Sequence, residues 1–260
     1  MSNSIELAHL GIGYKERGSV RFVGRNISCT AQSGRLTCLL GSNGVGKSTL
    51  LRTITGLQLP LEGTVYVSGH NLACMPRRQR ARTVSVVLTR RPMVQNMTVA
   101  EVVGIGRTPY TGLLGMLGKH DEEIVCQALH LVGMEALAGR SVQTLSDGER
   151  QKMMIAKALA QQTPVIVLDE PTAFLDFVTK ADVMTLLCRL CHDEGKTVLL
   201  STHDVQIALE TADDLWLMTN EGMTTGSVSA LAGNGTLEAF IKRPNIAFDK
   251  DTMNIKIARA

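Results

Sequence analysis

A glycine-rich segment near the start of the chain joins a short apolar run, Leu36–Leu40, to a helical pattern over Leu50–Ile54. The segment reads Gly41-Ser42-Asn43-Gly44-Val45-Gly46-Lys47-Ser48-Thr49. Its glycines allow the backbone to curl so that successive N–H groups point into one concavity, and the N-terminus of the following helix adds positive potential. A strand, a loop of this kind and a helix together predict a phosphate-binding loop (P-loop) in an α/β fold.

The polar residues of the P-loop are those that a nucleoside triphosphate requires. Lys47 is expected to reach the β- and γ-phosphates of ATP, and the hydroxyl of Ser48 is expected to bind Mg²⁺. The other loop residues expected to line the ATP site are Gly41, Ser42, Asn43, Gly44, Gly46 and Thr49.

Two carboxylates follow a second apolar run, Val165–Leu168. In open α/β sheets, ligands bind at the carboxyl ends of the strands, and successive strand residues point to opposite faces. Asp169 is therefore expected to hold Mg²⁺ through water, and Glu170 to orient or deprotonate the attacking water.

The pattern of strands and helices predicts an α/β fold with a P-loop NTPase core. Buried parallel strands are expected at Leu36–Leu40, Val165–Leu168 and Val198–Leu200, and short antiparallel strands in about the first 35 residues. Helical patterns such as Glu122–Val132 and Arg150–Ala160 replace the strand signals further along the chain. We interpret this stretch as a helical subdomain inserted in the core.

These signals divide the chain into three parts. Residues 1–88 and 161–222 are assigned to the nucleotide-binding core with its N-terminal antiparallel β subdomain, residues 89–160 to the helical insertion, and residues 223–260 to a C-terminal tail. In the tail, Ile246–Phe248 and Ile255–Ile257 flank a polar turn and are compatible with a β-hairpin.

The overall composition excludes several classes of protein. The 260 residues have a net charge of +3, which is too small to argue for nucleic acid. The longest apolar runs are of strand length, so no membrane span is expected, and the polar N-terminus shows no secretory signal. Six scattered cysteines in a chain of this size suit a reducing cytoplasm.

A further helix start lies at Leu145-Ser146-Asp147-Gly148-Glu149. Ser146 and Glu149 have the spacing of a capping box, which on its own indicates a well-capped helix. A serine hydroxyl and a glycine at a helix N-terminus can also form a second phosphate site. The capping pattern by itself leaves both interpretations open.

In this order, the motifs resemble those of the nucleotide-binding subunits of ABC transporters, over residues from about 5 to about 220. The segment at Leu145–Glu149 is similar to the family's signature, although Asp147 and Glu149 stand where Gly and Gln are commoner. Ala173–Asp176 resembles the D-loop that contacts a partner subunit. Ser201–Asp204 resembles the switch segment, in which His203 would sense the γ-phosphate, and Tyr14 stands where the family places an aromatic ring against adenine.

The resemblance implies a head-to-tail homodimer, with each ATP held between the P-loop of one chain and the signature of the other. The residues it assigns to nucleotide contact are Ser146, Gly148, Glu149 and Asp176, and its catalytic pair is Glu170 and His203. It also implies a permease pair in the membrane, an extracytoplasmic cargo-binding protein as an indirect partner, and no nucleic acid. The chain would then lie peripherally on the cytoplasmic face of the inner or plasma membrane.

Within the family, the segment Asn96–Tyr110 is similar to that of importers of iron–siderophore complexes, haem and vitamin B12. The resemblance is carried by the element Gly106-Arg107-Thr108-Pro109-Tyr110. The absence of a regulatory C-terminal domain points the same way.

One position departs from the family pattern. A core strand of the family ends in a glutamine that contacts Mg²⁺, whereas Thr89 ends the corresponding run here and Gln95 lies six residues on. A threonine hydroxyl can bind Mg²⁺ or a water, but its reach is shorter by about two heavy atoms. Thr89 is therefore expected to act as a metal ligand through water, or to be dispensable.

Other functions remain as alternatives. A non-transporting ABC ATPase acting on DNA or ribosomes would carry a coiled-coil insertion or a second cassette, and neither is visible in this sequence. A nucleotide-binding scaffold without hydrolysis would fit Thr89 but not the intact Glu170 and His203. An exporter is poorly distinguished by sequence.

The basic cluster Arg77–Arg82 is typical of a solvated face, with permease or headgroup contact as its alternative.

Overall fold

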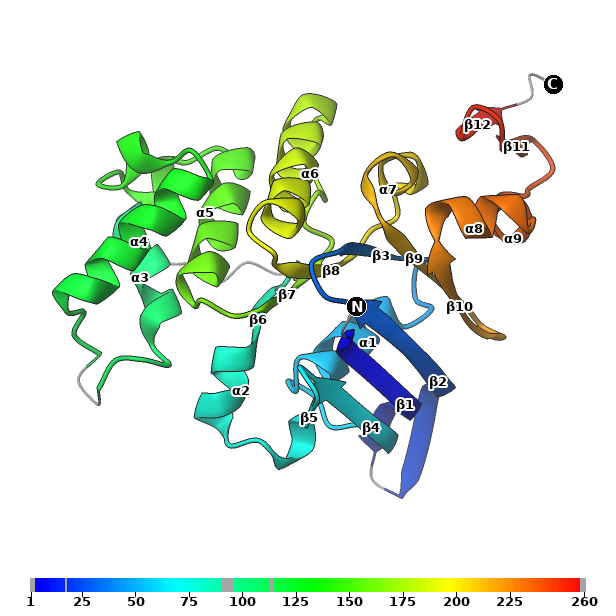
Figure 1. The fold of residues 1–260 in the computed structure, drawn as a ribbon, viewed down its shortest axis with the longest axis horizontal. Coiled ribbons are helices and arrows are strands. Elements are labelled where there is room, and N and C mark those ends of the chain that lie inside the picture. Colours follow the sequence, from blue (N-terminus) through cyan, green and yellow to red (C-terminus); the bar gives the residue numbers. More distant parts are fainter. Residues whose placement is uncertain (1–2, 17, 90–95, 113–114, 258–260) are drawn as a thin grey trace.

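The computed structural model describes residues 3–16, 18–89, 96–112 and 115–257. A six-stranded sheet runs through the middle of this described part, in the order β10-β9-β3-β8-β7-β6 (Figure 1). Strands β9, β3, β8, β7 and β6 are parallel to their neighbours, and β10 pairs antiparallel with β9 at the edge. The strands are β3 (Leu36–Gly41), β6 (Val84–Val87), β7 (Val165–Asp169), β8 (Thr197–Ser201), β9 (Asp214–Thr219) and β10 (Gly222–Ser227). The three parallel strands expected from the sequence are all present, and the predicted α/β fold class is confirmed.

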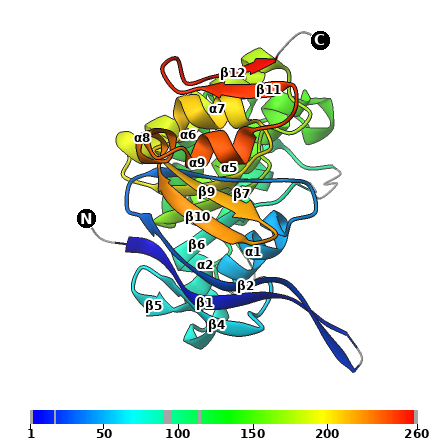
Figure 2. The same cartoon turned by 90° about the vertical axis from the view of Figure 1, so that its right-hand side faces the viewer.

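A second, antiparallel sheet with the order β2-β1-β4-β5 lies against the first (Figure 2). Its strands are β1 (Asn3–Glu16), β2 (Ser19–Gln32), β4 (Glu62–Val67) and β5 (His70–Asn71). The expectation of short strands in the first 35 residues is wrong, because β1 and β2 each span 14 residues. The residues that look like turn signals, among them Gly11 and Gly13, lie at register shifts inside β1 rather than at strand ends.

Alternating residues of the parallel strands face two different cores. Leu36, Cys38 and Leu40 of β3 pack with the helices of one face, whereas Leu39 packs with the antiparallel sheet and with α1 (Lys47–Ile54) on the other. Helix α1 is thus enclosed between the two sheets. This burial fixes the direction in which the P-loop leaves β3.

The helical stretch predicted from about residue 90 to residue 160 contains helices that pack on one another and on the core (Figure 1). Its helices are α3 (Val99–Gly104), α4 (Lys119–Leu131) and α5 (Asp147–Ala160). The remaining helices before the C-terminal part are α2 (Arg77–Thr83), α6 (Phe177–His192) and α7 (Val205–Thr211). Short 3₁₀ helices span Leu72–Cys74, Ile105–Arg107, Glu135–Leu137 and Val142–Thr144. No helix in the described ranges is both long and apolar enough to cross a membrane.

The C-terminal part is more structured than the weak sequence pattern indicates. It contains α8 (Val228–Gly233), α9 (Thr236–Ile241), β11 (Ile246–Asp249) and β12 (Asn254–Ile257). Strands β11 and β12 pair antiparallel, with Ile246 opposite Ile257, at the two segments that the sequence marks as compatible with a hairpin. The boundary drawn at residue 222 needs correction, because β10 continues the central sheet to Ser227. Strand β10 was not predicted, because it lies partly exposed at a sheet edge and its Gly- and Thr-rich sequence shows no alternation of apolar and polar residues.

Candidate functional site

The P-loop leaves the carboxyl end of β3 and enters α1 through two glycines with positive φ. Gly44 has φ of 79° and Gly46 has φ of 116°. A Cβ atom on Gly46 would lie 2.4 Å from Cγ1 of Val23, so a side chain is excluded at that position by both conformation and space. The loop residues Ser42 and Asn43 remain exposed. The structure therefore presents a curled, open backbone at the start of a helix, as the sequence predicts for a phosphate site.

Lys47 lies inside this loop. Lys47 is only 6% exposed. Its Nζ donates hydrogen bonds to the backbone oxygens of Gly41 at 2.8 Å and Ser42 at 3.3 Å. An ammonium group buried in this way requires acceptors, and the loop carbonyls supply them. The positive charge is thereby held at the concave side of the loop.

Three hydroxyl groups converge on Asp169 at the end of β7. The hydroxyls of Ser48 and Ser201 both donate to Oδ1 of Asp169, at 3.0 and 2.8 Å. Thr89 Oγ1 donates to the backbone oxygen of the same residue at 2.8 Å. Asp169 is 5% exposed, so these bonds are largely shielded from water.

This group fits Mg²⁺ by its chemistry. Mg²⁺ prefers hard oxygen ligands and is usually held by one or two carboxylates together with substrate phosphates and waters. Ser48 Oγ and Asp169 Oδ1 are such oxygens, and they already lie within hydrogen-bonding distance of each other. The described residues contain no cluster of three or more His, Cys, Asp or Glu side chains that could hold a metal by themselves. A site completed by phosphate oxygens is consistent with that finding.

Thr89 lies at this site but its hydroxyl proton is directed at the Asp169 backbone rather than into solvent. The oxygen of Thr89 keeps lone pairs that can accept a bond from water. Gln95, which follows Thr89 by six residues, lies outside the described residues.

Glu170 and His203 face each other across the end of the sheet. Oε2 of Glu170 lies 3.9 Å from Nδ1 of His203, and the two side chains are 25% and 57% exposed. Glu170 has a φ of 50°, a left-handed conformation that is uncommon for a residue with a side chain. Its N–H group donates to Ser201 Oγ at 3.0 Å, which helps to hold this turn of the chain.

Ser201 is the residue of this site whose role the sequence analysis missed. Its hydroxyl donates to Asp169 and accepts from the Glu170 N–H group, so it joins the two acidic residues. The parallel register of β7 and β8 places Ser201 opposite Asp169. A polar residue at the carboxyl end of a buried strand is a signal that could have identified it.

Tyr14 reaches the P-loop helix from the antiparallel sheet. Its hydroxyl lies 2.9 Å from Oγ1 of Thr49, and the residue is 41% exposed. The exposed ring and the tied hydroxyl leave an aromatic surface beside the P-loop, as expected for a residue that stacks on a base.

The residues of the signature and D-loop form a second group at the starts of α5 and α6. Ser146 and Glu149 form a complete capping box, with bonds of 2.7 and 3.2 Å, and Asp176 caps α6 by accepting the N–H of Thr179 at 3.0 Å. A Cβ on Gly148 would lie 2.6 Å from Cγ2 of Thr179, so the two helix starts touch at that glycine. The bonds donated by Ser146 lower the pKa of Glu149, and those donated by Thr179 lower the pKa of Asp176.

The structure thus divides the predicted site residues into two groups. In the part of the chain that the structure describes, no hydrogen bond or ion pair links Ser146, Gly148, Glu149 or Asp176 to the P-loop. Both residues that cap helices in the second group, Ser146 and Asp176, are exposed.

The basic cluster Arg77–Arg82 is more than a solvated face. Arg78 and Arg82 donate to the backbone oxygen of Pro109, and the Arg82 guanidinium stacks 4.5 Å above the ring of Tyr110. Arg107 stacks on the same ring at 4.0 Å and is itself buried. The Gly-Arg-x-Pro-Tyr element therefore connects the helical stretch to α2.

Comparison with known proteins gives one consistent result. The model of the ABC transporter family matches residues 24–173. A ferric enterobactin transport ATP-binding protein of Escherichia coli is 37% identical over 193 residues, 74% of this chain and 71% of that protein. An iron(3+)-hydroxamate import ATP-binding protein of Bacillus subtilis is 35% identical over 206 residues, 79% of this chain and 75% of that protein.

Solved structures agree with these relatives. A metal-chelate type ABC transporter in an inward-facing conformation superposes with a TM-score of 0.81 at 25% identity, covering 99% of this chain and 97% of that one. A dimeric ATP-binding cassette in a post-hydrolysis state, bound to ADP and Pi, gives a TM-score of 0.75 at 26% identity, with 86% and 98% of the two chains covered.

Proposed function

This chain belongs to the ABC transporter family of ATP-binding proteins, and from that membership we propose which of its residues, which metal and which partners carry its activity. It is the ATP-hydrolysing subunit of an ABC importer. The observation that carries the proposal is the convergence of Ser48, Ser201 and Thr89 on Asp169, with Lys47 in the adjoining loop and Glu170 facing His203.

In the proposed site the P-loop amides and Lys47 bind the β- and γ-phosphates of ATP, because backbone N–H groups and a buried cation compensate their negative charge. Ser48 and Asp169 hold Mg²⁺, which when bound neutralises charge that develops on the phosphates. Thr89 and Ser201 hold Asp169 in place through the backbone and the side chain respectively. Tyr14 stacks on the adenine ring.

Glu170 and His203 act on the γ-phosphate. The Glu170 carboxylate orients the attacking water and accepts its proton, and the left-handed turn at Glu170 aims this carboxylate toward His203 rather than back along the strand. His203, 3.9 Å from the Glu170 carboxylate, contacts the γ-phosphate beside it. The two side chains together are proposed to form the catalytic pair.

The second group of residues completes the site of another copy of the chain. Ser146, Gly148, Glu149 and Asp176 lie at exposed helix starts whose N–H groups suit a phosphate. We assign these helix starts to the ATP bound by the P-loop of a partner subunit, in a head-to-tail homodimer. The dimer works against a membrane-embedded permease pair, at the cytoplasmic face of the membrane, and an extracytoplasmic protein delivers the cargo to that pair. The cargo is proposed to be an iron–siderophore or a related metal chelate, haem or a cobalamin, since the relatives named above carry ferric chelates.

The Glu170→Gln variant tests the catalytic assignment. It should bind Mg-ATP but hydrolyse it at least ~100-fold more slowly, the scale of a lost general base. It should then elute from a sizing column as a dimer with Mg-ATP and as a monomer without it. A variant that stays monomeric and turns over like the wild type would contradict both the catalytic role and the dimer.

The cargo class is tested by uptake. Cells that lack this chain but retain its permease should regain import of a radiolabelled ferric siderophore with the wild-type chain and not with Lys47→Ala. Restored growth on haem or cobalamin without restored ferric uptake would reassign the cargo within the same class of importer.

A further inference from the structure

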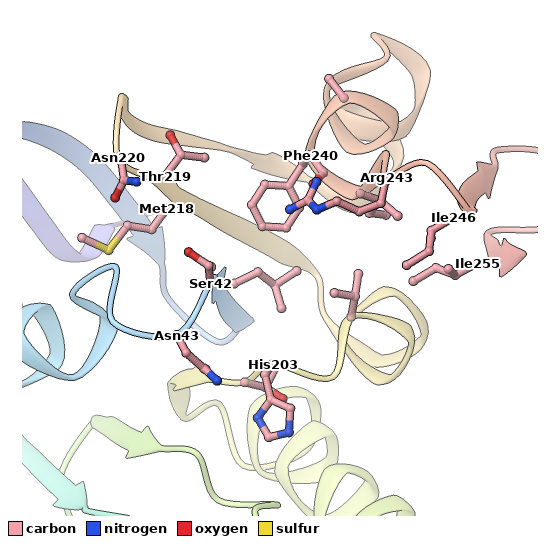
Figure 3. A pocket seen from close by; sticks show the side chains of 16 residues that line it. Ser42, Asn43, His203, Met218, Thr219, Asn220, Phe240, Arg243, Ile246 and Ile255 are labelled. Atoms are coloured by element: carbon pink, nitrogen blue, oxygen red, sulfur yellow. The ribbon is translucent and has the colours of Figure 1, made fainter. Parts of the chain in front are cut away.

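A cavity of about 590 Å³ separates the switch histidine from the C-terminal hairpin. Figure 3 shows Asn43 and His203 on one side of this cavity and Phe240, Ile246 and Ile255 on the other. The hairpin thus stands beside the catalytic end of the sheet, although it follows His203 by more than forty residues in the sequence. Its position raises the question of what connects it to the site.

His203 itself is held by little besides its own loop. Its side chain is 57% exposed, and the ion-pair partner that the structure shows for it is Glu170 at 3.9 Å. The loop is closed by Asp204, whose N–H donates to Thr202 Oγ1 at 3.0 Å and whose carboxylate caps α7 and pairs with Lys180. The position of the imidazole therefore depends on where α7 lies.

Helix α7 spans seven residues, too few to be stable without external contacts. One of those contacts comes from Gln206, in its first turn. The Gln206 Oε1 accepts the backbone N–H of Ile255 at 3.3 Å, and its Nε2 donates to Oδ1 of Asn254 at 3.1 Å. Both amide atoms of Gln206 thus bond to β12, and Nε2 also donates to Oε1 of Glu210 within α7 at 2.7 Å.

Bonds within its turn and packing of its apolar side chains hold the hairpin in place. Asp249 accepts the backbone N–H groups of Asp251 and Thr252 within the turn and pairs with Lys256 across the strands. The apolar side chains Ile246, Phe248 and Ile255 pack against the main core. A hairpin held at its turn and at its apolar face can fix the helix that is bonded to it.

We infer that Gln206 and the C-terminal hairpin are positioning elements for His203: the hairpin holds the start of α7 through Gln206 so that the imidazole stays aimed at the γ-phosphate. This inference rests on the proposed role of His203. It assigns a part in ATP turnover to residues 246–257, and Gln206 acts through the switch loop without contacting the nucleotide.

The test compares full-length variants in ATP turnover. Gln206→Met keeps the length and helix propensity of the side chain but removes both bonds to β12 together with the bond to Glu210. Glu210→Ala removes only the bond within α7 and should keep wild-type kcat, and Lys250→Ala alters the exposed tip of the same hairpin as a second control. Gln206→Met should lower kcat roughly fivefold, the scale of a lost hydrogen bond, with KM for ATP unchanged and the folded circular dichroism spectrum retained. Lys250→Ala should leave kcat, KM and the melting temperature unchanged.

A double variant separates positioning from a general structural role. In a His203→Ala background, measured with radiolabelled ATP, Gln206→Met should cause no further loss, because the group that it positions is absent. The same fivefold loss of kcat in that background would overturn the inference. Wild-type kcat in Gln206→Met, together with a strongly reduced kcat in His203→Ala, would also overturn it. Wild-type turnover in His203→Ala alone would contradict the proposed function, and the inference with it.

Discussion

The phosphate-loop end of the central sheet and the starts of helices α5 and α6 are both rich in polar groups, but they are built differently. Lys47 and Asp169 are 6% and 5% exposed, and their polar atoms are bonded to residues from several strands and loops. Ser146 and Asp176 are exposed, and each bonds within the three residues that follow it. The first group is held by bonds between different strands and loops, whereas the second is held mainly by capping bonds within each helix.

This difference has a functional consequence. A capped helix start satisfies its first N–H groups within its own helix, so it can be presented to another molecule without leaving those groups unpaired. A buried ammonium or carboxylate needs its neighbours at all times. The comparison supports the proposal that the P-loop end is the half of the ATP site that one chain completes, and that the helix starts are the half that it offers to a partner.

The largest effect is expected from Lys47→Ala, at the phosphate-loop end of the central sheet. This change should abolish ATP hydrolysis, because the lysine is the cation that neutralises phosphate charge inside the loop. It leaves two backbone oxygens without their donor, which should lower the free energy of unfolding by only about 1 kcal/mol. Turnover and circular dichroism, compared with the exposed-site variant Lys119→Ala, check this. Near-normal turnover in a folded Lys47→Ala protein would refute the P-loop assignment.

A smaller but more specific effect is expected when two inactive variants are mixed. Lys47→Ala and Ser146→Arg are each expected to lack every complete site as homodimers. In the mixture, the intact P-loop of the Ser146→Arg chain meets the intact Ser146 of the Lys47→Ala chain. Occlusion of labelled ATP should therefore be detectable in the mixture and not in either variant alone. Occlusion by one variant alone would show that both groups act within a single chain.

The smallest effect is expected at Thr89, beside Asp169 at the phosphate-loop end of the sheet. Its hydroxyl donates to the Asp169 backbone at 2.8 Å, and we propose that it contacts Mg²⁺ only through water. Thr89→Ala should therefore lower basal turnover by less than ~10-fold, or about 1.4 kcal/mol of barrier, while Thr89→Ser retains the hydroxyl and wild-type turnover. We expect a larger loss in stimulation by the permease and the cargo-binding protein. If Thr89→Ala is as impaired as Glu170→Gln in basal turnover, Thr89 is a direct ligand. If neither basal nor stimulated rate changes, coupling runs elsewhere.

The local chemistry of this protein could be predicted from its sequence. The P-loop, the acidic end of β7 and the capping box at Ser146 are each specified by adjacent residues, through glycine conformation, apolar run length and side-chain-to-backbone bonding. The α/β class followed from the same signals because buried parallel strands read as short apolar runs. The length of β1 and β2 did not follow, since bulge residues and turn residues are the same amino acids.

What only the tertiary structure decided are the contacts between residues far apart in sequence. Ser201 meets Asp169 across 32 positions, Thr89 meets it across 80, and Gln206 meets Ile255 across 49. Each contact depends on strand register or on how a hairpin packs, and these are set by the summed burial of many side chains rather than by a local pattern. For that reason the sequence determined which groups are the candidates for phosphate chemistry, and the packing of the sheets and the C-terminal hairpin determined what holds those groups in position.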